Sequence, residues 1–309
     1  MSTAEHAAEV PAQRAAARRG PRLKNFGDMW WRHLVGIVAS VIALFPVVYV
    51  ISAAFNGDST LSSASVIPHS FTWSNFSTLF SSQKHFASAS DYPYWYMNTV
   101  VVSASTALLT VVLGALAAYA FSRFRFKGRR IGMLSLLLIQ MFPQLLAVVA
   151  IYLIVHSVGG IFHVIGLNTI TALIVVYLGG VMGVNTWLLK GFFDTIPAEL
   201  DESARVDGAT PGQVFWGVVF PLAAPVLAVI AMLSFIGTLN EFVIASVILQ
   251  TSKHQTLAVG LFNFISGQYA QFWGPFSAGV LLAAIPVVVL FLSLQKFIVT
   301  GLTQGAVKG

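Results

Sequence analysis

The chain has 309 residues, of which 57% are hydrophobic and 9% are charged, and its mean hydropathy is +0.80. This composition excludes a water-soluble globular domain and is typical of a polytopic membrane protein. Cysteine is absent, which excludes disulfides, thiolate metal sites and cysteine nucleophiles. A pI near 9.7 indicates basic cytoplasmic loops in such a chain. We therefore expect membrane lipid, and no nucleic acid, as a partner.

The first segment, residues 1–33, mixes Ala, Arg, Pro and acidic residues without apolar periodicity. We predict that it is a disordered cytoplasmic tail. A cleaved signal peptide is the alternative. It is disfavoured because the first apolar run is long enough to span a membrane and no clear small-residue cleavage site follows it.

Long runs without ionised residues locate the membrane spans, because a charge at the bilayer centre costs roughly 2.5–3.5 kcal/mol. The longest run, Ile131–Leu189, accommodates two spans joined by a loop rich in Gly and His. The predicted spans are residues 34–55, 99–122, 131–155, 169–189, 216–237 and 276–297. They lie in a membrane domain of residues 34–298, followed by a C-terminal tail of residues 299–309. The predicted fold class is an all-α polytopic membrane protein with six transmembrane helices.

The distribution of positive charge supports this count, since Lys and Arg concentrate in cytoplasmic loops. With six spans and both termini in the cytoplasm, 15 of the 17 Lys and Arg residues lie inside. Only Lys84 and Lys253 lie outside. The loop of residues 193–214, between the fourth and fifth spans, is then cytoplasmic.

This loop is unusually acidic, with five of the eleven acidic residues of the chain within fourteen positions. They are Asp194, Glu199, Asp201, Glu202 and Asp207. Pro197 suits a first helical turn and Gly208 a C-terminal stop, so we predict a short helix from about Pro197 to Asp207. Asp201 and Arg205 are four residues apart and predict an ion pair on that helix.

A second helix is predicted directly after Gly208. Thr210 and Gln213 have the spacing of a capping box, with Pro211 just inside the helix. The segment therefore predicts a helix, a sharp turn and a further helix. The alternative is a solvated loop that its acidic residues keep soluble.

The same segment contains a longer pattern. Glu202-Ser203-Ala204 is followed after three residues by Gly208, and after nine more by Val218-Val219-Phe220-Pro221. This resembles the EAA motif of ABC importer permeases, which is Glu-Ala-Ala, three residues, Gly, nine residues and Ile-x-Leu-Pro. Ser203, Val218 and Phe220 differ from the family residues but keep their size or apolar character.

The resemblance implies a type I ABC importer permease fold, in which this helix docks in a cleft of a separate ATPase subunit. Glu202 would then contact a basic residue of the ATPase, Ala204 would pack in the cleft, and Gly208 would permit the turn. The residues that the resemblance assigns to ATPase coupling are Glu199, Glu202, Ser203, Ala204, Asp207, Gly208 and Pro221.

The chain has no Gly-x-x-x-x-Gly-Lys-Ser/Thr loop, so we expect ATP to be hydrolysed on another subunit. It is accordingly predicted to have no catalytic residues and not to be an enzyme. The seven histidines show no metal-binding spacing, so no metal site is predicted either. We expect no cofactor on this chain, with ATP and Mg bound by the partner ATPase.

Three further segments resemble the smaller permease subunit of maltose/maltodextrin ABC importers. They are Asn240-Glu241-Phe242, Gln255–Gly260 and the C-terminal Gly301–Gly309. The resemblance implies a homologous larger permease subunit, two copies of an ABC ATPase and an extracytoplasmic sugar-binding protein as partners. It also implies a multi-pass protein of the bacterial cytoplasmic (inner) membrane.

In that family the terminal tail reaches between the ATPase subunits, and the loop between the fifth and sixth spans enters the pocket of the binding protein. The tail residues here are Gln304, Gly305, Ala306, Val307, Lys308 and Gly309. The loop residues are Thr251, Ser252, Lys253, His254 and Gln255. The alternatives are a frayed terminus and a surface loop without a role in ligand release.

Asn240 and Glu241 are candidates for the substrate path, because an ionisable residue near the membrane is often functional. The alternative is that Glu241 is a structural partner for a helix end or for a neighbouring subunit.

The predicted function is transport of maltose, maltodextrin or a related oligosaccharide such as trehalose, driven by ATP. An ion-coupled secondary transporter is the alternative, but it would normally need ionisable groups inside the spans. An intramembrane enzyme is ranked last, since no metal-binding or paired-carboxylate motif lies within a span.

Overall fold

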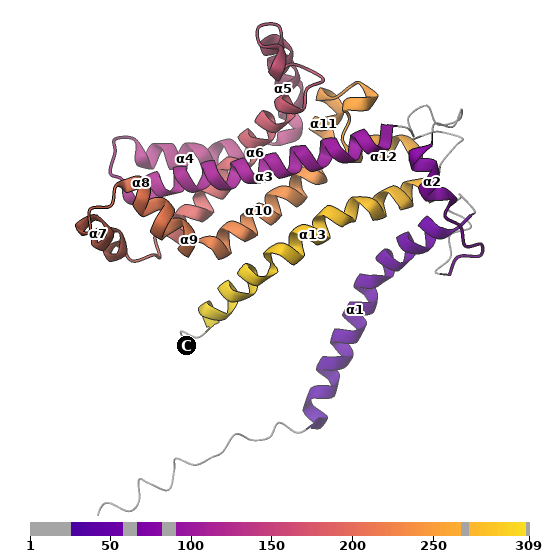
Figure 1. Ribbon diagram of the computed structural model, residues 1–309, viewed down its shortest axis with the longest axis horizontal. Helices are drawn as coiled ribbons and strands as arrows, with labels where there is room; N and C mark the ends of the chain where they lie inside the picture. Colours follow the sequence, from indigo (N-terminus) through magenta and orange to yellow (C-terminus); the bar gives the residue numbers. More distant parts are fainter. Residues whose placement is uncertain (1–25, 58–66, 82–90, 267–271, 307–309) are drawn as a thin grey trace, which may run out of the picture. The chain divides into compact units, whose positions relative to one another are not determined.

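The computed structural model of the chain describes residues 26–57, 67–81, 91–266 and 272–306, and their regular elements are helices (Figure 1). An isolated β-bridge joins Asn56 to Phe71. The helices are α1 (Phe26–Phe55), α2 (Ser74–Phe80), α3 (Tyr92–Arg123), α4 (Arg129–Gln140), α5 (Gln144–Gly159), α6 (Ile170–Phe193), α7 (Ala198–Val206), α8 (Pro211–Val214), α9 (Phe220–Leu222), α10 (Ala224–Leu239), α11 (Val243–Ile248), α12 (Leu257–Ile265) and α13 (Trp273–Ala306). Short 3-10 turns cover His163–Ile165 and Ser252–His254, and a π-helix covers Phe215–Val219.

The chain divides into two units, residues 1–49 and 50–309. The first unit contributes most of α1, an apolar helix with Pro46 inside it. The remaining helices belong to the second unit.

Among the described residues, four helices are long and apolar enough to cross a membrane: residues 30–55 of α1, α3, α6 and residues 273–297 of α13. Two bent pairs pass the same test, α4 with α5 and the helical segment 211–222 with α10. If each bent pair is one span, the chain has the six spans predicted from its sequence. The all-α, polytopic fold class is therefore confirmed.

Two spans that we predicted as single helices are broken by proline. Residues 131–155 form α4 and α5, which meet at an angle of 101°, and residues 216–237 are bent by 78° near Ala223. Proline has no N–H and disfavours helical backbone in the residue before it. Pro143 therefore separates α4 from α5, and Pro225 cannot donate to the carbonyl of Pro221.

Some helices extend beyond the predicted spans. α1 begins at Phe26, so residues 26–33 of the predicted tail are helical, whereas residues 1–25 lie outside the described residues. α13 continues to Ala306, so residues 299–306 extend the last helix instead of forming a separate tail. Counting charge-free residues locates the hydrocarbon core and not the end of a helix, because the backbone hydrogen bonds of a helix persist into the headgroup layer.

α3 packs most extensively against α6 and α10. One face of α3 carries small, fully buried polar side chains at helical spacing: Thr99, Ser103, Thr106 and Thr110. Small residues let transmembrane helices approach closely, which is the main source of their attraction in lipid. The buried stripe therefore places α3 at the centre of the second unit.

Thr99 also makes a hydrogen bond to a distant part of the chain. Its Oγ1 accepts from the backbone N–H of Leu257, at 2.7 Å, in a buried environment. Leu257 is the first residue of α12, so its N–H has no acceptor within that helix. The threonine therefore caps α12 from α3.

Replacing Thr99 with valine keeps the shape of the side chain but leaves the buried N–H of Leu257 without its acceptor. We expect Thr99→Val to lower the free energy of unfolding by about 1–3 kcal/mol. The measurement is the midpoint of thermal unfolding of the purified protein in detergent. Thr106→Val is the matched control, because its hydroxyl is equally buried and the described residues give it no hydrogen-bond partner. Equal losses of stability in the two variants would contradict the capping role of Thr99.

Candidate functional site

The acidic cytoplasmic segment folds as a helix, a tight turn and a second helix. α7 is followed by Gly208 with φ +89°, a left-handed conformation that favours glycine. The backbone N–H of Thr210 donates to Gln213 Oε1 at 2.8 Å, and Thr210 Oγ1 accepts from the N–H of Gln213 at 3.4 Å. This is the predicted capping box, so the local structure follows the capping signals of the sequence.

The predicted ion pair between Asp201 and Arg205 is wrong. The carboxylate of Asp201 points into the protein, where Oδ2 lies 2.7 Å from Nε of Arg123 at the end of α3. Asp201 is only 3% exposed. Arg123 also donates from Nη2 to the carbonyl oxygen of Ile196, at 2.9 Å. A single arginine, with its side chain only 11% exposed, thus fixes both α7 and the chain that leads into it.

The opposite face of α7 is open. Its exposed residues combine two acids with small and apolar side chains: Glu199, Leu200, Glu202, Ser203 and Val206. Val206 is 87% exposed. Such a mixture of charge and apolar surface is available to a partner protein.

Not every residue assigned to coupling lies on this face. Asp207 and Gly208 are exposed at the turn, and Pro221 is exposed further along the chain in α9. Ala204 is partly buried and packs against a core cluster that includes Tyr119, Phe193 and Phe215. The structure therefore directs Ala204 towards the interior of its own chain.

A second set of contacts joins the cytoplasmic ends of α3 and α6. Asp194 accepts a hydrogen bond from Ser122 Oγ at 2.7 Å and forms an ion pair with Lys190. Partial burial alone would raise the pKa of the Asp194 carboxyl, but the hydrogen bonds from Lys190 and Ser122 and the charges of Lys190 and Arg129 outweigh it, so the pKa lies below its usual value. Asp194 therefore stays ionised and links the two helix ends.

The loop between α11 and α12 lies at the other end of α3 (Figure 1). Trp95 Nε1 donates to the carbonyl oxygen of Ser252 at 2.7 Å, and Asn98 Nδ2 donates to those of Lys253 and Gln255 at 2.9 and 3.0 Å. Lys253 Nζ lies 5.6 Å from the centroid of the Tyr94 ring.

The start of this loop is held from the other side. Asn168 Oδ1 accepts from the backbone N–H groups of Gln250 and Thr251, at 2.7 and 2.8 Å. Thr251, Lys253 and His254 are nevertheless exposed. The backbone of the loop is therefore held in place by hydrogen bonds, while its polar side chains face outwards.

These two regions are separated by the length of α3. Its 32 residues extend about 48 Å at 1.5 Å per residue, which is enough to cross a bilayer including its headgroups. Given the positive charge around the inner end, α7 lies on the cytoplasmic side and the 250–255 loop on the outer side.

Glu241 has hydrogen bonds that fit a structural role. Its carboxylate accepts from the backbone N–H groups of Ile244 and Ala245 at 2.8 and 3.0 Å, and from the hydroxyl of Tyr177. It therefore caps the first turn of α11. Asn240 is exposed, and its Nδ2 donates to the carbonyl oxygen of Ile236, at 3.0 Å.

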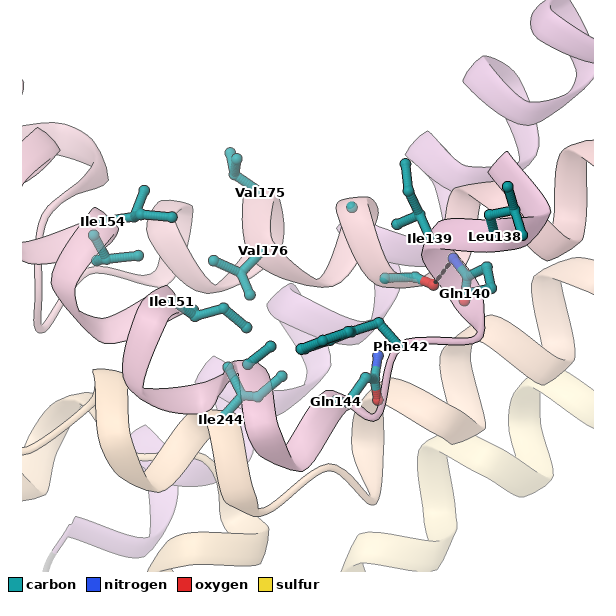
Figure 2. A pocket seen from close by; sticks show the side chains of 14 residues that line it. Leu138, Ile139, Gln140, Phe142, Gln144, Ile151, Ile154, Val175, Val176 and Ile244 are labelled. Atoms are coloured by element: carbon teal, nitrogen blue, oxygen red, sulfur yellow. Dashed lines mark hydrogen bonds between the residues drawn. The ribbon is translucent and has the colours of Figure 1, made fainter. Parts of the chain in front are cut away.

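A cavity of about 730 Å³ lies where α4 breaks into α5, against α6 and α11 (Figure 2). Its walls are mainly aliphatic, and its polar side chains are Gln140 and Gln144, one on each side of the break. Gln140 Nε2 donates to the carbonyl oxygen of Gly180, at 2.6 Å. Neither glutamine was predicted from the sequence, although the position of both around Pro143 in a charge-free run is a detectable signal.

The remaining predicted residues lie near the end of the chain. Gln304, Gly305 and Ala306 form the end of α13, and Val307, Lys308 and Gly309 lie outside the described residues. Within the described residues, no group of three His, Cys, Asp or Glu side chains could hold a metal ion.

The chain has clear relatives among known proteins. Residues 110–304 match the family described as "Binding-protein-dependent transport system inner membrane component". The chain is 38% identical to the galactooligosaccharides transport system permease protein GanQ of Bacillus subtilis (strain 168), over 93% of this chain and 98% of that protein. It is 36% identical to the maltose/maltodextrin transport system permease protein MalG of Escherichia coli (strain K12), over 90% of this chain and 95% of that protein.

Similarity extends to a solved structure. A chain in the crystal structure of a bacterial ABC transporter involved in the import of the acidic polysaccharide alginate superposes with a TM-score of 0.71, at 22% identity, over 90% of this chain and 99% of that chain. At this identity the match shows the fold, which is that of a type I importer permease. The resemblance to carbohydrate ABC importer permeases is confirmed, and the chain belongs to the family of binding-protein-dependent transport system inner membrane components.

Proposed function

We propose that this chain forms half of the translocation pathway of an ATP-driven oligosaccharide importer and receives its driving force through α7. The importer would also contain a homologous second permease, two ATPase subunits that bind ATP and Mg, and an extracytoplasmic sugar-binding protein. The observation that carries the proposal is that α7 exposes two acids on one face and is anchored by a buried ion pair on the other.

The exposed face of α7 suits docking to a basic surface. Glu199 and Glu202 supply negative charge, and Leu200 and Val206 supply apolar area beside it. Charge complementarity favours a partner that carries Lys or Arg. An ATPase subunit with a basic cleft would meet both requirements.

The buried face of α7 suits transmission of movement. Arg123 belongs to α3, so a displacement of α7 acts on a helix that runs through the second unit to the outer loop. An ion pair with little exposure resists separation more than a surface pair does, because separation would leave two poorly solvated charges unpaired. We infer that α7 and the inner end of α3 move together.

The substrate class is proposed from relatives and from the cavity. The similar proteins are named for galactooligosaccharides, maltodextrin and maltose/maltodextrin, so we propose a short oligosaccharide of neutral sugars. Gln140 and Gln144 each offer a donor and an acceptor, which is what sugar hydroxyls require in a mainly apolar cavity. The exposed 250–255 loop is the proposed contact with the binding protein.

The docking role of α7 is tested by reversing one exposed charge. We expect Glu202→Lys to abolish co-purification of the ATPase subunit and reduce sugar uptake at least tenfold, because like charges would then face each other. Glu202→Gln, which removes the charge without reversing it, should have an intermediate effect. Because Glu202 is exposed, neither change should lower the thermal unfolding midpoint of the permease. Unchanged association and uptake in Glu202→Lys would refute the docking role.

The anchoring role of Asp201 is tested by a double-mutant cycle with Arg123. Asp201→Leu alone leaves the poorly solvated Arg123 side chain without its carboxylate, and we expect it to cost about 3–5 kcal/mol of stability. Arg123→Met with Asp201→Leu should recover much of this loss, since no unpaired charge remains. The readout is thermal unfolding of the purified protein, and strictly additive effects would show that the two side chains do not interact.

The proposed contact of the outer loop is tested through its support on α3. Trp95→Phe removes the hydrogen bond to Ser252 but keeps an aromatic ring in the buried site, so we expect the loop to loosen without loss of the fold. Sugar uptake at limiting binding protein should fall severalfold, while co-purification of the ATPase is unaffected. If Trp95→Phe took up sugar at the wild-type rate under these conditions, a role for the fixed loop geometry would be excluded.

A further inference from the structure

A second cavity of about 790 Å³ lies between the inner parts of α4 and α6. Three cationic side chains line one part of it: Arg129, Arg130 and Lys190. Aliphatic side chains, including Leu134 and Leu137, and the indole of Trp187 line the remainder. The site therefore has a charged end and an apolar end.

The charged end keeps a net positive charge after its internal contacts are counted. Lys190 is paired with Asp194, which also accepts a hydrogen bond from Ser122. Arg129 Nη2 donates weakly to the carbonyl oxygen of Ser122, at 3.4 Å, and within the described residues no carboxylate lies within 4 Å of Arg130. The N-terminus of α4, a helix of 12 residues, adds its positive dipole end at the same place.

The apolar end lies at the depth of acyl chains. Arg130, Leu134 and Leu137 are spaced four and three residues apart, so they form one stripe along α4. Leu137 lies about 12 Å along the helix from Arg129 at 1.5 Å per residue, which takes the stripe from the headgroup layer into the hydrocarbon. Trp187 is one turn before Lys190 on α6, where an interfacial indole is expected.

This combination selects one chemical class of ligand. A sugar would need hydrogen-bond acceptors, whereas the charged side chains that line the cavity supply donors. A free anion would need the arginines but would leave the aliphatic wall without a function. An amphiphile with a phosphate group uses both ends, and basic pockets between transmembrane helices on the cytoplasmic side are suited to such headgroups.

We propose that this cavity binds one anionic phospholipid from the cytoplasmic leaflet. Its phosphate lies against Arg129, Arg130 and the first turn of α4. Its acyl chain follows Leu134 and Leu137 and passes Trp187. The bound lipid would connect the α3–α4 loop to the inner end of α6, next to the contacts of Asp194.

The test uses the purified transporter complex in detergent, titrated with phosphatidylglycerol or phosphatidylcholine and analysed by native mass spectrometry. We expect the complex to retain one phosphatidylglycerol at concentrations where phosphatidylcholine is lost. In Arg129→Gln/Arg130→Gln, the affinity for phosphatidylglycerol should fall about tenfold. In Arg130→Gln alone, the affinity for phosphatidylglycerol should fall severalfold. This variant is the less disruptive to the fold, because Arg130 is exposed.

The matched control is Arg125→Gln/Lys127→Gln, which removes the same charge from the adjoining α3–α4 loop, outside the cavity. It should change the affinity less than twofold. Leu134→Ser/Leu137→Ser should weaken phosphatidylglycerol binding, which a site for free phosphate would not predict. Equal losses in the two charge variants would overturn the proposal in favour of diffuse attraction. Displacement of the lipid by millimolar inorganic phosphate, or equal retention of the two lipids, would also overturn it.

Discussion

Close packing of α3 against α6 and α10 is the interaction on which the rest of the second unit depends. Apolar side chains gain little by leaving lipid for protein, so transmembrane helices associate through close contact and hydrogen bonds. A stripe of small buried side chains on α3 allows the close contact, and Thr99 provides a hydrogen bond to α12. Trp95 near the start of α3 contacts the outer loop, and Arg123 at its end contacts α7, so this one helix positions both regions.

The broken spans complement this continuous helix. A helix break in a membrane frees backbone groups that lipid cannot satisfy, so it is tolerated where protein side chains or a cavity provide partners. Gln140 and Gln144 flank the α4–α5 break, and the cavity of about 730 Å³ forms there against α6. The continuous helix α3 thus fixes the two loops, whereas the break between α4 and α5 borders an internal cavity.

The sequence predicted the features that depend on local chemistry. Charge-free runs located the spans, and Gly208, Thr210 and Gln213 indicated the turn and second helix beside α7. It could not predict contacts between distant residues. Asp201 was assigned to Arg205 by spacing, but its partner is Arg123, because helix packing turns the carboxylate inward. Charge counting also cannot detect a break such as that at Pro143, since proline carries no charge.

The few charges of this chain occupy three environments with different energetics. The Arg123–Asp201 pair is largely shielded from water, so each member is needed to offset the desolvation of the other. Glu202 lies in water, where its charge can meet a partner at little structural cost. Arg129 and Arg130 lie beside apolar side chains at the membrane boundary, where anionic headgroups attract basic side chains by about 1 kcal/mol each. Because the first two environments share α7, a single nine-residue helix presents charge to solvent on one face and is anchored to α3 through the other.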